Sequence, residues 1–345
     1  MKAGVRLCLF LGVIGITALL TACDRPDIHR DRFIAFGTVI ELSIYSSDAR
    51  AAAEAAQLIR EELEEMHQAW HAWQPSLLTQ TNELLALGHE LLIHPQLLPL
   101  LEDARRLSEA SDGLFHPGLG QLFALWGFHS DEPLGPPPSD EEITAVLNDN
   151  PSMQDLIIDA GFIKSTNPAL QLDLGAYAKG YALDQLSDLL RQQGFEHAII
   201  NAGGDLKAMG RPGKRPWRIG IRDPNNGVLA GIDTQGNEAI FTSGDYERYF
   251  EFEGQRFHHI LDPRTGYPAR GTRSVTVIHE NAAQADAAVT ALFVAGPERW
   301  LDIAQQMGMH YVMLLDDEDV LHVTEPMQNR LVLERQPAAV RVYRP

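Results

Sequence analysis

Cysteine is nearly absent from this sequence of 345 residues, which contains only Cys8 and Cys23. Because both lie within the first 23 residues, the remainder of the chain can form no disulfide and perform no thiol catalysis. Basic residues are also scarce: 28 Lys and Arg stand against 47 Asp and Glu, which leaves a net charge of −19. Nucleic-acid binding depends on Lys and Arg contacts to phosphate, so this balance argues against nucleic acid as a partner.

The common nucleotide and hydrolase motifs are missing as well. There is no G-x-x-x-x-G-K-[ST] loop and no G-x-G-x-x-G between a strand and a helix, so the standard phosphate cradles are excluded. G-x-S-x-G and H-E-x-x-H are also absent. His67 and His71 stand four residues apart in an expected helix and could bind a transition metal. Without an adjacent acidic ligand, a structural role is the favoured interpretation of this pair.

Long apolar runs are confined to the N-terminus, where residues 7–20 follow a basic start. This run is shorter than the roughly 20 residues that a membrane-spanning helix needs, and the pattern is typical of a secretory signal. Leu20-Thr21-Ala22-Cys23 resembles the lipobox of bacterial lipoproteins. The resemblance implies that residues 1–22 are removed as a lipoprotein signal peptide and that Cys23 is lipidated. An ordinary signal peptide with a chance cysteine is the alternative.

The expected lipid on Cys23 would anchor the protein to a membrane without spanning it. Asp24 follows directly, an arrangement that resembles the signal for inner-membrane retention in enteric-type bacteria. We therefore expect the protein at the periplasmic face of the bacterial inner membrane. Residues 23–31 are polar and are interpreted as a lipidated tether, which leaves residues 32–345 as the folded domain.

The folded part mixes helix and strand patterns without internal repeats. Asp48 is a suitable N-cap for the first of the helices, which are predicted at 48–70, 97–108, 140–147, 176–193 and 282–295. Strands are predicted at 33–45, 170–174, 197–201, 218–222, 239–241, 246–252, 256–261, 273–278 and 311–315. The regular βαβ alternation is missing, so the sequence predicts an α+β fold and not a doubly wound Rossmann sheet.

Four clusters hold polar residues that can do chemistry, three of them together with Gly. They are Asp173–Gly180, Asn201–Asp205, Thr242–Asp245 with His258–Gly266, and Asp286–Thr290. The first lies at an expected strand-to-helix junction, where free N–H groups favour an anion. Lys179 would add a positive charge there, although a solvated helix lysine is an equally good interpretation.

The other clusters offer a base and hard oxygen ligands. His258 and His259 are adjacent in a strand, so only one of them can face a site as a general base. Asp286 and Thr290 share one helix face, and their oxygens suit Mg²⁺ or Ca²⁺. A capping or solvated Asp with a back-bonded Thr is the simpler interpretation of that pair taken alone.

Taken in order, these clusters resemble the ApbE family of FAD:protein FMN transferases. The matching stretches are D-L-G-x-x-A-K-G at 173–180, N-A-G-G-D at 201–205, T-S-G-D at 242–245, H-I-L-D-P-R-T-G at 259–266 and A-D-A-x-x-T at 285–290. The resemblance implies an ApbE-like, T-fold-like catalytic domain with mixed, largely antiparallel sheets and packed helices. It also implies Mg²⁺-dependent transfer of FMN from FAD to a Thr or Ser hydroxyl of an acceptor protein, with release of AMP.

The same resemblance implies roles for individual residues. Asp286, Thr290 and the carbonyl of Ala176 match the Mg²⁺ ligands. Asp173, Lys179 and the main chain at Leu261 match contacts to FAD. Phe36 and Trp73 match positions that contact the flavin ring, and His259 is the expected base, with His258 directed away.

The sequence departs from the family pattern at one loop. Leu114, Phe115 and His116 match a segment that contacts FAD, but His116 replaces an acidic residue and Gly118 a hydroxyl residue. Two alternatives to the transferase therefore stay open: an FAD pyrophosphatase that yields FMN and AMP, and a non-enzymatic FAD-binding lipoprotein. Acceptors in this family carry a D-x-x-[ST]-G-[AS]-[ST] segment, as in Nqr-type and Rnf-type redox subunits, and such a protein is the expected partner.

Overall fold

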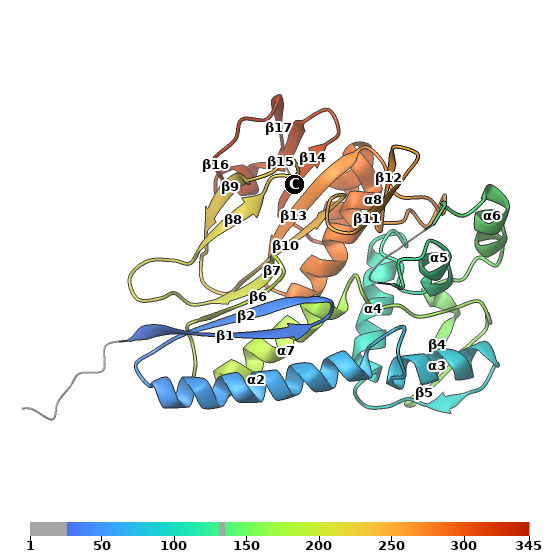
Figure 1. The fold of residues 1–345 in the computed structure, drawn as a ribbon, viewed down its shortest axis with the longest axis horizontal. Coiled ribbons are helices and arrows are strands. Elements are labelled where there is room, and N and C mark those ends of the chain that lie inside the picture. The colour runs from blue at the N-terminus through green and yellow to red at the C-terminus, as the bar shows by residue number, and fades with distance from the viewer. Residues whose placement is uncertain (1–25, 131–134, 345) are drawn as a thin grey trace, which may run out of the picture.

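The computed structural model describes residues 26–130 and 135–344. The expected signal peptide and Cys23 lie outside these residues. Eight α-helices and four β-sheets of the described part form an α+β fold (Figure 1). None of its helices combines the length and the apolar character that crossing a membrane requires.

A nine-stranded sheet runs through the molecule. Its neighbouring strands pair antiparallel, except that β15 and β17 pair in parallel. In spatial order the strands are β1 (Asp27–Ala35), β2 (Thr38–Ser46), β6 (Ala198–Ala202), β7 (Asp205–Met209), β10 (Glu238–Gly244), β13 (Thr272–His279), β14 (Tyr311–Asp316), β15 (Val320–Thr324) and β17 (Ala339–Tyr343). The predicted α+β class with largely antiparallel strands is confirmed.

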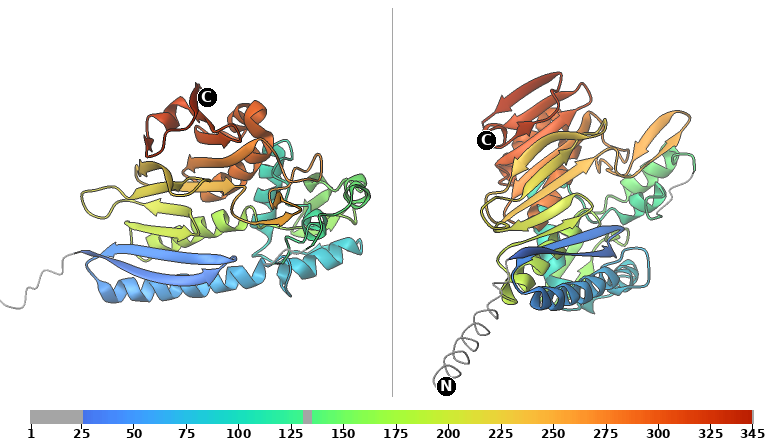
Figure 2. Two further views of the ribbon diagram at one scale, coloured as in Figure 1. Left: turned by 45° about the horizontal axis from the view of Figure 1, so that its top comes forward. Right: turned by 60° about the vertical axis from the view of Figure 1, so that its left-hand side comes forward.

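Three long helices, α2, α7 and α8, pack against one face of this sheet. Figures 1 and 2 show α2 running along the β1–β2 hairpin, with α7 and α8 following toward the later strands. The helices are α2 (Ala49–Ala69), α3 (Leu77–Ala86), α4 (Leu98–Ala110), α5 (Gly120–Leu125), α6 (Asp140–Asn148), α7 (Ala178–Gln192), α8 (Ala282–Gln306) and α9 (Glu325–Gln328). The predicted cap at Asp48 is confirmed, because its side chain accepts the Ala51 N–H.

Both faces of the sheet are buried along its central strands. On β10, Phe241 joins the core that the helices cover, whereas its neighbour Ile240 joins a second core. That second core packs against a small sheet, because side chains alternate between the two faces of a strand. The small sheet contains β16 (Val332–Leu333), β9 (Val228–Asp233) and β8 (Arg218–Arg222).

A third core lies under the β11–β12 hairpin, beside α5 and α6 (Figure 2). It contains Trp126, Phe128 and Phe257. The remaining elements are β11 (Tyr249–Phe252), β12 (Gln255–His258), a short 3₁₀ helix (Met153–Asp155), and a sheet of β3 (Leu91–Leu92), β5 (Phe162–Ser165) and β4 (Leu156–Asp159).

Several predicted boundaries are wrong. The predicted strand 33–45 is a hairpin, because Phe36 and Gly37 both take positive φ values, 50° and 70°, and form a two-residue turn. Residues 27–31, predicted as tether, pair with β2 as part of β1. The predicted strand 170–174 is reduced to one bridge, in which Gln171 pairs with Leu119.

The helix predicted at 282–295 is interrupted just after its predicted end and then continues. The helical conformation predicted to stop at Ala295 is interrupted at Gly296, whose φ and ψ of 71° and 176° are non-helical. Pro297 then begins a second helical stretch that continues α8 to Gln306.

Candidate active site

The site forms where the first turn of α7 meets α8. The Gly180 N–H donates to Asp286 Oδ2 at 2.8 Å, so a carboxylate of α8 caps α7. A side chain at Gly180 is excluded, because its Cβ would lie 2.3 Å from the carbonyl oxygen of Ala282. The glycine of the sequence cluster therefore permits the close approach of the two helices.

Asp184 of α7 makes a second contact between the same two helices. Its Oδ2 accepts the N–H groups of Ala282 and Ala283 at the start of α8, at 2.8 and 3.0 Å. Its Oδ1 accepts from the buried Lys207 Nζ at 2.9 Å. The two helices thus cap each other, which fixes the position of Asp286 relative to α7.

Lys179 lies between two carboxylates at this crossing. Its Nζ is 3.3 Å from Asp205 Oδ2 and 4.0 Å from Asp286 Oδ1. Burial alone would lower the pKa of Lys179, but the charges of Asp286 and Asp205 outweigh this effect and raise it. Burial raises the pKa of Asp286 to about 6, against the opposing effect of Lys179. The ammonium is therefore fixed in its charged form, and the enclosed carboxylates favour a further cation.

Asp286 and Thr290 follow each other by one turn of α8, as predicted. Asp286 is buried and Thr290 half-buried. Neither Asp286 Oδ1 nor Thr290 Oγ1 makes a hydrogen bond to another described residue, so Thr290 is not back-bonded to its helix. Both oxygens are available to a hard cation.

The third predicted ligand, the carbonyl of Ala176, lies in the turn that leads into α7. No group of three or more His, Cys, Asp or Glu gathers as a metal centre within residues 26–130 and 135–344. A cation here would depend on one carboxylate, one hydroxyl and one carbonyl, a donor set that suits Mg²⁺ better than Zn²⁺.

Two turns bring distant segments to this crossing. The Gly203 N–H donates to the Val39 carbonyl at 3.2 Å, and a Cβ at Gly203 would lie 2.3 Å from Thr38 Oγ1. The β6–β7 turn therefore lies directly against the β1–β2 turn. This contact brings Phe36 to the same side of the molecule as Asp205, and hence as Lys179.

Asp173 and Trp73 come together from separate loops. Asp173 Oδ1 accepts the Gly175 N–H at 2.8 Å, whereas its Oδ2 is buried and has no hydrogen-bond partner among the described residues. Burial raises the pKa of Asp173, and the Gly175 bond and the nearby Trp73 indole oppose this rise. An unpartnered buried oxygen of this kind suits a ligand that brings a donor.

The two adjacent histidines differ in what their ring nitrogens contact. His258 is buried, with Nε2 at 2.8 Å from the Ala269 carbonyl and Nδ1 accepting the Ile260 N–H. His259 Nδ1 lies 3.2 Å from the Arg248 carbonyl, and its Nε2 makes no hydrogen bond within the described residues. Burial and the charge of Arg248 lower the pKa of His259 to about 3, which keeps its ring neutral. Its free Nε2 can accept a proton, and the catalytic role of His259 stays a prediction.

The turn after these histidines is structural. The Gly266 N–H donates to the Asp262 carbonyl at 2.8 Å, and the Asp262 side chain accepts two bonds from the Arg264 guanidinium. The Trp126 indole donates to the Gly266 carbonyl at 2.8 Å. These contacts fix the main chain that begins at Leu261, the part of that residue expected to bind ligand.

The loop that departs from the family pattern is tightly packed. Leu114 and Phe115 are 3% and 1% exposed, so only their main chain can meet a ligand. A Cβ at Gly118 would lie 2.5 Å from Leu170 Cδ1, so a larger residue there would require the Leu170 side chain to shift. His116 Nδ1 accepts the Gly118 N–H, and burial lowers the pKa of His116.

Sequence reasoning missed two residues that the structure adds to the site. Asp205 pairs with Lys179, and its Oδ1 accepts the Thr242 N–H at 2.9 Å. Its position in the N-A-G-G-D motif could have identified it as a site residue from the sequence. Arg248 holds His259 through its carbonyl, a contact between separate segments that no local pattern announces.

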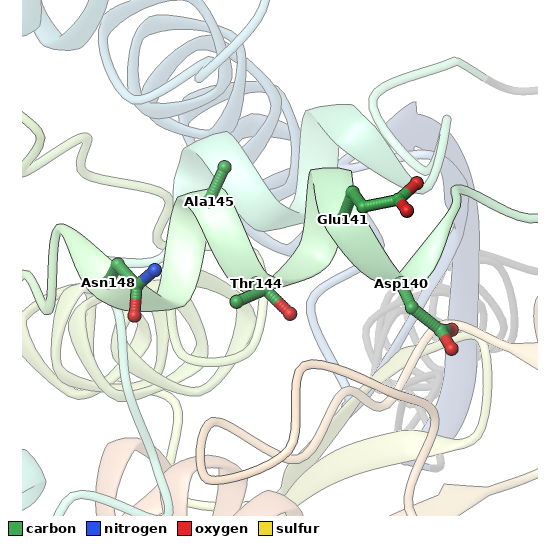
Figure 3. A pocket seen from close by; sticks show the side chains of 5 residues that line it. All are labelled: Asp140, Glu141, Thr144, Ala145 and Asn148. Atoms are coloured by element: carbon green, nitrogen blue, oxygen red, sulfur yellow. The ribbon is translucent and has the colours of Figure 1, made fainter.

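A shallow hollow elsewhere on the surface does not belong to this site. Figure 3 shows it along one face of α6, lined by Asp140, Glu141, Thr144, Ala145 and Asn148. None of the predicted site residues lines it.

Comparison with known proteins identifies sequence relatives. The sequence profile of the ApbE family matches residues 36–313. A protein of Rhodobacter capsulatus named FAD:protein FMN transferase is 42% identical over 331 residues, which cover 96% of this chain and 63% of the relative. A protein of the same name from Klebsiella pneumoniae (strain 342) is 34% identical over 324 residues, which cover 89% and 92%. The chain thus spans less than two thirds of the first relative and most of the second.

Solved structures agree with the sequence relatives. An ApbE protein of Thermotoga maritima superposes with a TM-score of 0.81 at 32% identity and covers 90% of this chain and 100% of its own. The flavinyl transferase ApbE of Pseudomonas stutzeri gives a TM-score of 0.78 at 30% identity, over 88% and 97%.

Proposed function

The chain belongs to the ApbE family, and on this basis we propose that it transfers FMN from FAD to a Thr or Ser hydroxyl of an acceptor protein. The observation that carries the proposal is the crossing of α7 and α8. There Lys179, Asp205 and Asp286 come together, and Asp286 Oδ1 and Thr290 Oγ1 have no hydrogen-bond partner in the described part of the chain.

We propose that Mg²⁺ is held by Asp286, Thr290 and the Ala176 carbonyl. Bound there, the ion would neutralise charge on the FAD diphosphate. On a protein with a net charge of −19, a dianionic group needs such local positive charge. Lys179 supplies a second positive charge beside the same carboxylates.

The other proposed FAD contacts surround this point. The orphaned Oδ2 of Asp173 would accept a donor of FAD, and the main chain of Leu261 and of Leu114–His116 would bind further parts of it. Phe36 and Trp73 would flank the flavin ring, where aromatic contact stabilises it.

His259 is the proposed base. Because its Nδ1 lies against the Arg248 carbonyl, the proton of the neutral ring belongs on Nδ1, and Nε2 can take the proton of the acceptor hydroxyl. The hydroxyl oxygen then bonds to the FMN phosphorus, the bond to the AMP oxygen breaks, and AMP leaves. The product is a phosphoester between FMN and the acceptor.

The experiment that tests the function uses residues 24–345, FAD, MgCl₂ and a purified acceptor domain that carries the D-x-x-[ST]-G-[AS]-[ST] segment. Intact mass spectrometry should show a gain of one FMN minus water on the acceptor, which EDTA abolishes. AMP without labelling would instead indicate a pyrophosphatase with a spoiled acceptor site. Bound FAD with neither product would indicate a flavin-binding protein without activity.

We also propose that the protein is a lipoprotein, attached through Cys23 to the periplasmic face of the inner membrane, and that its acceptors are Nqr-type or Rnf-type redox subunits. The lipobox-like sequence and Asp24 support the anchor and its location, and membership of the ApbE family supports the acceptor class. Metabolic labelling with a palmitate analogue should mark the wild-type protein and leave Cys23→Ser unmarked. Equal labelling of both proteins would contradict the anchor.

A further inference from the structure

His67 lies in the last turn of α2, and His71 lies just after the helix, next to its C-cap residue Trp70, although the sequence placed both in one helix. Their rings are 5.5 Å apart and meet edge to face. Each ring also binds the backbone of a different segment beside the proposed flavin position. These two contacts give the pair a role that its spacing alone does not reveal.

His67 holds the β1–β2 turn. Its Nδ1 accepts the Phe36 N–H at 3.3 Å, and its ring meets the edge of the Phe36 ring at 5.5 Å. Phe36 has a φ of 50°, a conformation that non-glycine residues adopt only when their surroundings enforce it. The Phe36 ring also stacks on Trp70, at 6.2 Å between ring centres.

His71 holds the segment that follows α2. Its Nδ1 accepts the N–H groups of Trp73 and Gln74, both at 3.0 Å. The His71 carbonyl accepts the Ser76 hydroxyl at 2.6 Å, which closes the same turn. The Trp73 ring then lies 5.6 Å from that of His129.

These bonds also decide between the two earlier interpretations of the pair. A ring nitrogen that accepts an N–H carries no proton, so each histidine uses its Nδ1 lone pair on the backbone and bears its proton on Nε2. Neither ring then offers a lone pair to a shared metal ion. The structural interpretation holds, and the partners of the two histidines make it specific.

We propose that His67 and His71 are positioning residues for the flavin ring, which they serve by fixing the backbone of Phe36 and Trp73. The proposal rests on the proposed function, because it takes these two aromatic residues as the walls of the flavin position. Loss of either Nδ1 acceptor frees one wall, so FAD binds more weakly. The phosphoryl chemistry takes place elsewhere and is unaffected once FAD is bound.

The test measures the FAD dissociation constant, from the quenching of flavin fluorescence, together with the KM for FAD and the kcat of FMN transfer. His71→Phe and His67→Phe remove the acceptor and keep a ring. Each should weaken FAD binding about 3- to 10-fold, the equivalent of one net hydrogen bond, with a matching rise in KM and little change in kcat. His71→Asn, whose Oδ1 can occupy the Nδ1 position, should restore wild-type binding.

Matched controls separate positioning from general effects. His94 makes the same kind of bond, from the Gln96 N–H to its Nδ1 at 3.3 Å, in the loop before α4. His94→Phe should leave FAD binding unchanged. Phe36→Ala and Trp73→Ala should weaken it at least as much as the histidine variants. If His71→Phe does not fold, as judged by its melting temperature, His71→Ala answers the same question.

The outcomes distinguish the proposal from the function on which it rests. Wild-type affinity in both Phe variants, or a loss in His71→Asn equal to that in His71→Phe, would overturn the positioning role while FAD still binds the wild type. A wild-type protein that binds no FAD would instead remove the proposed function. Weak binding in the Phe variants with recovery in His71→Asn would support the proposal.

Discussion

The helices α7 and α8 cross with an Asp and a Lys at each of two contacts, and the two contacts differ in what they leave unbonded. At Asp184, both carboxylate oxygens are used, one by Lys207 and the other by the first two N–H groups of α8. At Asp286, only Oδ2 is bonded, to the Gly180 N–H, while Oδ1 stays 4.0 Å from Lys179. The first contact is complete within the protein, and the second has capacity for a ligand.

The difference teaches how a functional acid can be told from a structural one. Both residues are capping carboxylates beside a lysine, so residue type and spacing do not separate them. Their hydrogen bonds do, because both oxygens of Asp184 are bonded within the protein, whereas Asp286 Oδ1 has no hydrogen-bond partner among the described residues and is available to a ligand. Under the proposed function, the bound species would be Mg²⁺ and the FAD diphosphate.

Replacing Asp286 should give the largest effect on activity. Asp286→Asn keeps an acceptor for the Gly180 N–H but removes the charge, so FMN transfer should fall about 10³-fold. Folding should be retained. Initial rates of acceptor labelling measure the loss, and full Mg²⁺-dependent turnover in this variant would refute the metal assignment.

The matched substitution at Asp184, whose two carboxylate oxygens are both bonded, should lower stability and leave activity unchanged. Asp184→Asn leaves the buried Lys207 without its ionic partner and should lower the free energy of unfolding by about 3 kcal/mol. Urea denaturation measures this loss. Transfer per folded molecule should stay near the wild-type rate, and a selective loss of catalysis without loss of stability would erase the contrast between the two contacts.

His258 and His259 differ in the same way, because only His259 has a ring nitrogen without a hydrogen bond to another described residue. His259→Ala should slow transfer about 10²-fold, because the free Nε2 is lost as the base. His258→Ala should mainly lower the melting temperature, since both ring nitrogens of His258 serve the fold. Transfer at the wild-type rate in His259→Ala, with loss in His258→Ala, would reverse the assignment.

The smallest predicted effect is a pH dependence of stability in EDTA. Folding raises the pKa of Asp286 from its ordinary value near 3.8 to about 6, so the folded state holds this proton more tightly than the unfolded state. Stability should therefore fall as pH rises from about 4 to 6. Melting curves should show this fall in the wild type and a smaller one in Asp286→Asn. Identical pH profiles would argue that the Asp286 carboxyl is not the titrating group.

Local patterns made much of the fold and part of the site predictable. The cap at Asp48, the β11–β12 hairpin and the helix from Ala282 all follow from short-range sequence signals. The D-L-G-x-x-A-K-G cluster identified the start of α7, where Gly180 and Lys179 lie. Such signals are readable because the residues that satisfy one another are close in sequence.

The failures have a common physical cause in long-range contacts. The polar character of residues 27–31 predicts a tether. They form a strand because they pair with β2, and no local pattern shows that pairing. The turn at Phe36 was missed because a phenylalanine with positive φ is unusual, and His67, 31 residues away, holds it in place. Likewise, Lys179 meets Asp205 only through the packing of α7 on the sheet.

The most direct test of the account is the melting temperature of three proteins, each with EDTA and with saturating MgCl₂ and FAD. A ligand that binds only the folded state raises the melting temperature. Wild type and Asp184→Asn, although they start from different temperatures, should gain similar increments, and Asp286→Asn should gain little. An equal increment in Asp286→Asn would contradict the claim that the contact at Asp286 between α7 and α8 is the ligand site.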